Sequence, residues 1–229
     1  WYLIDAQSRK WAQLQVLDPT RYRTVFTWLL TQDQGTPIEV AFAPDNRRFA
    51  VGTVAARDGQ LASTVYCMEI GSTTATAQYT ATAGSMVLRL QWLSGSRLLA
   101  VFDTYAALLD PATGAELARY DYEGSALQGI SVQGSTVALL LSAHSGNTLA
   151  LLDTDLAPVG EIDAGQAASV TCADSEAYLI ENNTVLCYGL DGTLRWEQEY
   201  ATRPLYLLNA AEPLLFTAGR VEVLTAPAA

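Results

Sequence analysis

The chain has 229 residues, of which 50% are hydrophobic and 16% are charged, with a formal net charge of −11. This composition is typical of a folded domain with a sizeable core and argues against disorder. The acidic balance repels phosphate backbones, and no apolar run approaches the roughly 18 residues of a membrane span, so the sequence predicts neither a nucleic-acid partner nor a span within this chain.

The first 37 residues do not keep the spacing of the rest of the chain. Residues 1–18, WYLIDAQSRKWAQLQVLD, resemble the last two strands of a sheet, with Asp5 at their turn. Residues 18–37 are interpreted as an insertion or irregular segment. The segment contains apolar residues, too many for a free loop: Val25, Phe26, Trp28, Leu29 and Leu30. Two alternatives stay open, an extra strand or short helix that caps the sheet, and a docking surface for a partner.

From residue 38 onward, an apolar strand, a turn and a second apolar strand recur. Period-two alternation around turn residues predicts a β-hairpin in each case. The predicted hairpins are Ile38–Gly52, Leu88–Phe102, Leu127–Leu141, Ala168–Asn182 and Leu205–Gly219. Their turns centre near Asp45, Gly95, Gly134, Ser175 and Glu212, at intervals of 50, 39, 41 and 37 residues.

A second hairpin follows each of the first four. Its turn carries Asp or Gly, at Gly71, Asp110, Asp153 and Gly189 to Gly192. In residues 108–122, LLDPATGAELARYDY, Pro111 fixes φ and the Asp110 carboxylate can accept hydrogen bonds from turn amides. Gly114 is predicted to adopt a positive φ. The repeating unit is therefore four antiparallel strands in about 40 residues.

This repeat predicts an all-β fold, a β-propeller of four-stranded blades. A single sheet cannot bury both of its faces, whereas stacked sheets can, and the apolar runs Leu98–Phe102 and Val137–Leu141 suit strands covered on both faces. A β-sandwich is the competing architecture, but it would not require a regular recurrence. The chain ends with three predicted strands and begins with two, which together overfill one blade. We expect an incomplete ring of five or more blades that lacks upstream strands, with five closed blades and one surplus strand as the alternative. Residues 1–229 are treated as a single propeller domain.

Several motifs resemble those of known propeller families. FAPDNRRFAVG, residues 42–52, is similar to the strand-turn-strand motif of WD40-like bacterial propellers, including the TolB-type repeats. LLDPATGAELARY and GLDGTLRWEQEY resemble a hairpin of quinoprotein-like propellers. The repeats lack the Gly-His and Trp-Asp pairs, and only Trp196 stands at the quinoprotein tryptophan position. The resemblance therefore implies a bacterial propeller fold in a family without assigned function, and neither family's activity is carried over.

The sequence contains little that points to catalysis. His144 is the only histidine and is predicted in an exposed turn between a second and a third strand. Three cysteines, Cys67, Cys172 and Cys187, lie in apolar runs without zinc-ligand spacing, and each is predicted to be a small buried residue. A disulfide between Cys172 and Cys187 is disfavoured because their strands are not adjacent. We therefore predict no metal and no cofactor.

Carboxylates offer the one catalytic alternative. The available residues are Asp45, Asp103, Asp110, Asp153 and Asp191. Turn geometry explains all of them except Asp103, which follows an apolar strand. A pair of such acids would suit a carboxylate-dependent glycoside hydrolase or lyase on a propeller scaffold.

The favoured hypothesis is a non-catalytic binding module that recognises a protein, peptide or glycan through its loop faces. We identify no catalytic or metal-binding residue, and the binding residues are not specified by sequence. A monomer is expected. The propeller resemblance predicts an extracytoplasmic or membrane-tethered location, with a missing N-terminal segment as the anchor, and a cytoplasmic location is the alternative.

Overall fold

The computed structural model describes residues 2–5, 12–57, 59–173, 175–209 and 213–227. Throughout these segments the regular secondary structure is β-strand, which confirms the all-β prediction. The chain divides into two compact units, residues 1–121 and residues 122–229, and each is described by itself. That residues 1–229 form a single domain stays a prediction.

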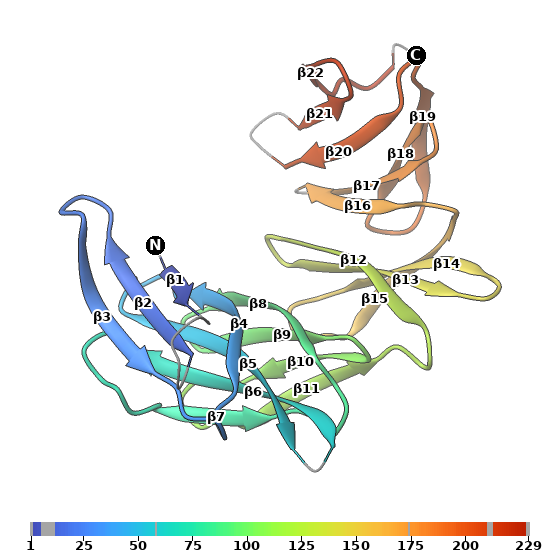
Figure 1. Ribbon diagram of the computed structural model, residues 1–229. Coiled ribbons are helices and arrows are strands. Elements are labelled where there is room, and N and C mark those ends of the chain that lie inside the picture. Colours follow the sequence, from blue (N-terminus) through green and yellow to red (C-terminus); the bar gives the residue numbers. More distant parts are fainter. Residues whose placement is uncertain (1, 6–11, 58, 174, 210–212, 228–229) are drawn as a thin grey trace. The chain divides into compact units, whose positions relative to one another are not determined.

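The first unit is built from antiparallel strands that pair in chain order (Figure 1). Its strands are β1 (Tyr2–Asp5), β2 (Gln13–Asp18), β3 (Arg23–Leu29), β4 (Thr36–Phe42), β5 (Arg48–Arg57), β6 (Gln60–Glu69), β7 (Ala77–Thr80), β8 (Val87–Ser94), β9 (Arg97–Phe102), β10 (Tyr105–Leu109) and β11 (Glu116–Asp121). They form sheet 1 (β1-β2-β3), sheet 2 (β4-β5-β6-β7) and sheet 3 (β8-β9-β10-β11).

The second unit repeats this arrangement. Its strands are β12 (Ala126–Gln133), β13 (Thr136–Ala143), β14 (Gly146–Leu152), β15 (Pro158–Gly165), β16 (Ser169–Ala173), β17 (Glu176–Glu181), β18 (Thr184–Gly189), β19 (Leu194–Glu199), β20 (Pro204–Leu208), β21 (Leu214–Thr217) and β22 (Val221–Val223). They form sheet 4 (β12-β13-β14-β15), sheet 5 (β16-β17-β18-β19) and sheet 6 (β20-β21-β22).

The predicted hairpins are confirmed. They correspond to β4–β5, β8–β9, β12–β13, β16–β17 and β20–β21, and sheets 2 to 5 each have the predicted four strands. Sheet 6 has the three strands expected at that end. The turn centre predicted at Glu212 lies outside the described residues.

Residues 18–37 contain an extra strand, β3, which is one of the alternatives left open for this segment, in place of an irregular insertion. β3 pairs with β2, so that Trp28 lies opposite Leu14 and Phe26 lies opposite Val16. Sheet 1 therefore has three strands where the sequence predicted two. The equivalent of the turn at Gly71 is the β2–β3 turn at Asp18, whose carboxylate accepts a 2.9 Å hydrogen bond from the Thr20 amide. Asp5 lies at the end of β1. The prediction that matched Asp5 to the turn at Gly71 was therefore wrong by one strand.

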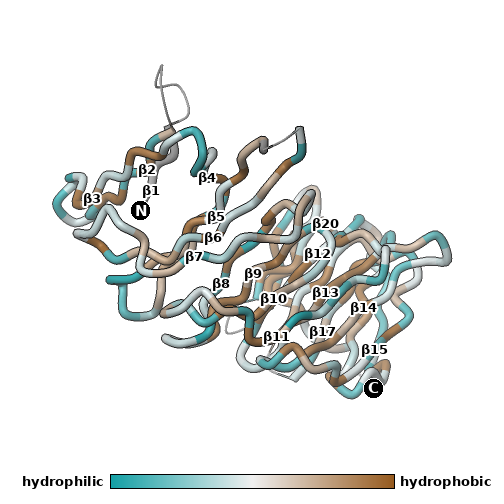
Figure 2. Tube along the Cα trace, turned by 90° about the horizontal axis from the view of Figure 1, so that it is seen from below, coloured by the Kyte–Doolittle hydropathy of each residue, from teal (hydrophilic) through white to brown (hydrophobic). Residues whose placement is uncertain are grey.

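Apolar side chains fill the space between successive sheets of each unit. Between sheets 1 and 2, the ring of Trp28 meets Tyr66 edge-on at 5.3 Å, and Phe26 meets Phe49 at 5.4 Å. Further cores lie between sheets 2 and 3, sheets 4 and 5, and sheets 5 and 6. All residues of β10 and Leu98–Phe102 of β9 are buried, as predicted for strands covered on both faces. Figure 2 shows these hydrophobic stretches along β9, β10 and β13.

Side-chain hydrogen bonds to backbone groups join the first strands of neighbouring sheets. The Trp92 indole on β8 donates to the Ala41 carbonyl on β4 at 3.1 Å. Ser131 on β12 accepts from the Cys172 amide on β16 at 2.8 Å, and the Thr171 hydroxyl donates to the Leu207 carbonyl on β20 at 3.0 Å. Each bond satisfies a backbone group of an edge strand, so the sheets are held by polar contacts as well as by apolar packing.

Gly114 provides a direct test of this packing. Its φ is +76°, as predicted, and a Cβ atom placed on it would lie 2.2 Å from the Gln78 carbonyl oxygen on β7 of the neighbouring sheet. We expect Gly114→Ala to lower the free energy of unfolding by more than the about 1–2 kcal/mol of a left-handed residue alone. Gly71→Ala is the matched control, because Gly71 lies in the equivalent turn of sheet 2 at φ +99° with no atom within 4 Å. Equal losses in urea unfolding would contradict the close approach.

Ala100 tests the assignment of β9 as a buried middle strand. It is fully buried in the core between sheets 2 and 3. We expect Ala100→Asp to prevent folding, because it buries an unpaired charge. Ala143→Asp, at the exposed end of the middle strand β13, should melt close to the parent. A cooperative thermal transition of Ala100→Asp near that of the parent, followed by circular dichroism, would refute the assignment.

Candidate functional site

Each carboxylate considered for catalysis accepts hydrogen bonds from nearby backbone amides. Asp45, Asp110, Asp153 and Asp191 each accept hydrogen bonds from amides of their own turns, at 2.8–3.1 Å. Asp103, the acid that turn geometry did not explain, accepts a 2.8 Å hydrogen bond from the Met86 amide across the β8–β9 pair. Each of the five lies in a different hairpin.

The electrostatics of these turns also oppose acid catalysis. Hydrogen bonds from the Arg48 and Arg47 amides lower the pKa of Asp45 to about 2. The Ala112 amide lowers the pKa of Asp110, and Thr113 adds a side-chain bond. The Thr193 hydroxyl and amide lower the pKa of Asp191. A glycosidase acid requires a raised pKa, so Asp45, Asp110 and Asp191 do not suit that role.

The remaining reactive side chains are separate from one another. His144 lies exposed in the β13–β14 turn, as predicted. The three cysteines are free and buried, with β17 between the strands of Cys172 and Cys187. Burial raises the pKa of Cys67 to about 11 and those of Cys172 and Cys187 to about 12, which makes these thiols poor nucleophiles. Among the residues that the structure describes, no group of three or more His, Cys, Asp or Glu side chains could hold a metal ion, and no helix is long and apolar enough to cross a membrane.

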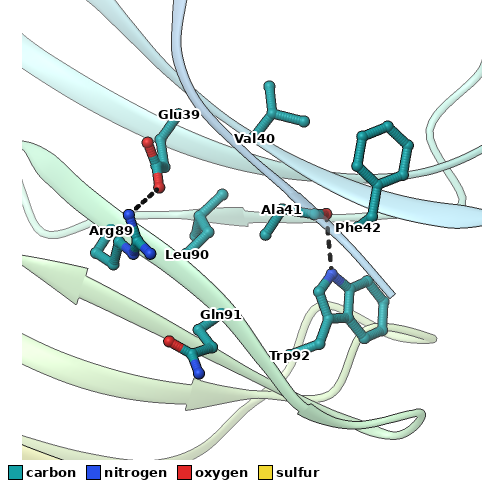
Figure 3. Close-up of a pocket in the computed structure, with 8 residues that line it drawn as sticks. All are labelled: Glu39, Val40, Ala41, Phe42, Arg89, Leu90, Gln91 and Trp92. Atoms are coloured by element: carbon teal, nitrogen blue, oxygen red, sulfur yellow. Dashed lines mark hydrogen bonds and ion pairs between the residues drawn. The ribbon is translucent and has the colours of Figure 1, made fainter. Parts of the chain in front are cut away.

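Among the described residues of the first unit, two of the hollows could accept a ligand. The first is a groove of about 350 Å³ between β4 and β8, the first strands of sheets 2 and 3 (Figure 3). Glu39 and Arg89 face each other across it, with 3.7 Å between their charged groups. Trp92 lies at its other end, where its indole bonds Ala41 and the Arg48 guanidinium stands 5.4 Å from its ring. This groove is therefore polar, and its charged groups already have partners.

The second hollow, which we call the apolar hollow, has a volume of about 480 Å³ and lies between sheets 1 and 2. Sheet 1 contributes residues of β2, β3 and their turn, and sheet 2 contributes residues next to the β4–β5 and β6–β7 turns. The lining residues are Val16, Leu17, Asp18, Pro19, Val25, Phe42, Asn46 and Ile70. Five of the eight are apolar residues other than proline, and Val25 is 39% exposed. The apolar hollow therefore lies beside the β2–β3, β4–β5 and β6–β7 turns.

Tyr22 distinguishes the turn beside this hollow. In each of sheets 1 to 5, the turn between the last two strands contains one residue with positive φ. These residues are Tyr22 (51°), Gly71 (99°), Gly114 (76°), Leu156 (59°) and Gly192 (82°). A non-glycine residue is strained in this conformation.

Only one of the two non-glycine residues in these turns gains packing in return. Leu156 is 3% exposed, so its burial offsets the strain. Tyr22 is 91% exposed. Backbone strain that no burial of the side chain offsets is characteristic of functional positions. Tyrosine is also enriched in protein interfaces. The geometry thus singles out Tyr22 and the apolar hollow as the candidate binding site.

Arginine side chains stand around this site. Arg21 and Arg47 are 68% and 78% exposed, and each has a long ion pair, with Asp18 at 3.9 Å and with Glu69 at 3.6 Å. Such exposed pairs contribute little to stability, so Arg21 and Arg47 can exchange Asp18 and Glu69 for acidic groups of a partner at low cost. An acidic group on a ligand would find two donors here.

A further polar network joins sheets 2 and 3 at their last strands. Tyr79 on β7 donates a 2.6 Å hydrogen bond to Glu116 on β11 and receives a 3.2 Å bond from Arg119. Arg119 also pairs with Glu116 at 3.0 Å and stacks 3.8 Å above the Tyr105 ring. The network fixes the contact between two sheets, and we assign it a structural role.

The network predicts a component of acid sensitivity. Arg119, and to a lesser extent Tyr79, lower the pKa of Glu116. Because the folded-state pKa is below the unfolded value, this carboxylate stabilises the fold above its unfolded pKa, and the stabilisation is lost as the pH falls through the folded pKa. Glu116→Gln should therefore destabilise the protein by no more than about 1 kcal/mol at pH 7 and by less at pH 3.

The measurement is urea unfolding at both pH values. Glu161→Gln is the control, because Glu161 lies exposed on β15, the equivalent strand of sheet 4. A loss for Glu116→Gln that does not change with pH would contradict the role of the ionised carboxylate.

The recurrent four-stranded sheets, stacked through their first strands, place the protein in the β-propeller class. The chain belongs to a family of unknown function, DUF5711, whose model matches residues 6–224. Among curated proteins, none matches this sequence.

Solved structures confirm the fold class. BamB from Moraxella catarrhalis is 12% identical with a TM-score of 0.62, over 94% of this chain and 70% of that one. The WD40 domain of Toxoplasma gondii coronin is 11% identical with a TM-score of 0.67, over 97% and 67%. The WD40 domain of Neurospora crassa Pan2 is 9% identical with a TM-score of 0.61, over 94% and 70%. At such identities the likeness concerns the fold alone. It confirms the predicted resemblance to WD40-like propellers in a family without assigned function.

Proposed function

We propose that this chain is a non-catalytic binding module that recognises a protein or peptide through the apolar hollow and Tyr22. The observation that carries the proposal is the left-handed, 91% exposed Tyr22 next to the apolar hollow of about 480 Å³. A propeller presents its turns as a rigid platform, and function on such a fold depends on the site rather than on the architecture.

The lining favours a particular ligand chemistry. Val16, Val25, Phe42 and Ile70 can enclose an apolar side chain, whereas a glycan would need more hydrogen-bonding groups than these residues offer. Arg21 and Arg47 supply positive charge close by. We therefore expect a peptide segment with an aliphatic or aromatic anchor next to Asp or Glu. An extracytoplasmic location and a monomeric state stay predictions that accompany this proposal.

Peptide display tests the proposal. A random peptide library is selected on the immobilised protein, and enriched peptides are measured by fluorescence anisotropy at low and high salt. We expect apolar-acidic sequences whose affinity falls with salt and is lost in Val25→Asp. Val159→Asp is the matched control, because Val159 is a comparably exposed valine, 52% accessible, on β15. Enriched peptides that bind both variants equally would refute the site.

Tyr22→Gly separates binding from stability. Glycine adopts positive φ without strain, so the free energy of unfolding should stay the same or rise by up to about 1 kcal/mol. The affinity for the selected peptides should nevertheless fall. Unchanged affinity in a variant of parental stability would show that the tyrosine is not part of the site.

A further inference from the structure

Strand β3 forms an outer edge of sheet 1 (Figure 1). It pairs with β2 on one side, and among the residues that the structure describes no strand pairs with its other side. An open edge of this kind presents backbone N–H and C=O groups that can pair with an additional strand. Sheet 1 and the apolar hollow beside it both lie within residues 1–121.

Two residues of β3 direct their backbone groups toward this open edge. The Leu30 amide donates to the Ala12 carbonyl at 2.9 Å, so these two residues form a hydrogen-bonded pair. Bonded and non-bonded pairs alternate along an antiparallel ladder, and the register continues without a shift from this pair to Thr27. Leu29 and Thr27 therefore belong to non-bonded pairs, and their N–H and C=O groups point away from β2.

The other outer strands carry features that oppose such pairing. β11, β15 and β19, the last strands of sheets 3 to 5, each contain at least two charged residues, and β15 begins with proline. β7, the last strand of sheet 2, has only four residues. Charged side chains, proline and short length are the means by which proteins prevent edge strands from pairing with other chains.

β3 lacks these protective features. It has seven residues, and Thr24–Leu29 contains neither a charged residue nor a proline. This segment consists of β-branched and aromatic residues and one leucine, Leu29, which is 62% exposed. Such a composition favours strand pairing. A β-bulge interrupts the ladder at Val25, but β11, β15 and β19 have a bulge at the same position, so the bulge does not distinguish β3.

The open stretch of β3 begins next to the apolar hollow. Val25 lines the hollow, and the following residue, Phe26, points toward sheet 2. Residues directly opposite each other in a sheet point to the same face. In a strand added to β3, the residue opposite Phe26 would therefore project toward sheet 2, on the side where the hollow lies. Backbone pairing with Thr27 and insertion of a side chain into the hollow are thus compatible.

Positive charge at the start of β3 specifies the direction of the added strand. Arg21 and Arg23 are both exposed at this end. Antiparallel pairing is the more stable arrangement, and an antiparallel strand runs from Leu29 past Phe26 toward the two arginines. Residues that follow the anchor would therefore lie beside Arg21 and Arg23, where acidic side chains complement the charge.

We propose that β3 binds an extended peptide segment of a partner protein, which adds to sheet 1 as an antiparallel strand. The segment has an apolar anchor for the hollow, acidic residues after the anchor, and no proline between them. The proposal rests on the proposed function, because the hollow takes the anchor, and it adds the conformation and direction of the ligand. Main-chain hydrogen bonds would supply affinity, whereas the hollow and the arginines would supply selectivity.

Amide hydrogen exchange tests the strand pairing. Peptides enriched from the random library are added to the full-length protein, and exchange is followed residue by residue by NMR. We expect the Thr27 and Leu29 amides to exchange rapidly in the free protein and at least roughly tenfold more slowly with peptide. The Phe26 and Trp28 amides belong to the bonded pairs with β2, so they should be protected in both states.

Thr27→Pro tests the same contact by mutation. It removes an outward N–H group but no hydrogen bond to β2, so the free energy of unfolding in urea should stay close to the parental value. The affinity for the enriched peptides should fall roughly tenfold. Glu161→Pro is the matched control, because Glu161 follows the β15 bulge by the same number of residues as Thr27 follows the β3 bulge. Equal affinities of the two variants would contradict the proposal.

The outcomes separate this proposal from the proposed function. Unchanged exchange at Thr27 and Leu29, with peptides whose binding is lost in Val25→Asp, would refute strand addition and leave the hollow as the binding site. Protection by peptides that bind Val25→Asp equally well would support strand addition and refute the hollow. Slow exchange of both amides before peptide is added would show that the edge is already covered, which contradicts the proposal. Failure to enrich any peptide would contradict both.

Discussion

The burial of sheet faces against each other is the constraint on which this structure depends. A four-stranded antiparallel sheet with apolar residues on both sides cannot cover itself, so its strands are stable only between neighbours. The consequences extend to single residues. Gly114 must lack a side chain because the β10–β11 turn touches the backbone of β7, and Trp92 must reach Ala41 because β4 and β8 are edge strands with unpaired backbone groups. Stacking therefore decides residue identity in the turns as well as in the core.

The repeat could be predicted from sequence because its signals are local. Alternation and turn residues located the hairpins such as Ile38–Gly52, and Asp110-Pro111 with Gly114 indicated the turn and its positive φ. The number of strands at the N-terminal end was predicted wrongly because the wrong aspartate was matched to the repeated turn. Asp18-Pro19 is another copy of the Asp-Pro turn, whereas Asp5 was aligned in its place, so the β3 segment appeared surplus. Its alternating burial, with Phe26 and Trp28 inward, becomes clear once β2 is its partner.

The candidate site could not be predicted in the same way. The apolar hollow is formed by Val16 and Val25 of sheet 1 and by Phe42 and Ile70 of sheet 2, and only the packing of the two sheets brings them together. The strain at Tyr22 is equally invisible in sequence, because no local signal requires that residue to be left-handed. The acids were easier to assess, since a turn explained four of them, and the structure supplied the Met86 amide as the partner that Asp103 lacked.

The three buried thiols give this chain a built-in set of reporters. Cys67 lies in the core between sheets 2 and 3, Cys172 between sheets 4 and 5, and Cys187 between sheets 5 and 6. Each sulfur is buried between two sheets, so a thiol reagent can reach it only when these sheets separate. Burial also raises the pKa of all three thiols, which keeps them protonated near neutral pH. The alkylation rates of the three positions would rank the opening free energies of three blade interfaces within one unlabelled molecule. The three alkylation rates would thus give the order in which the blades separate.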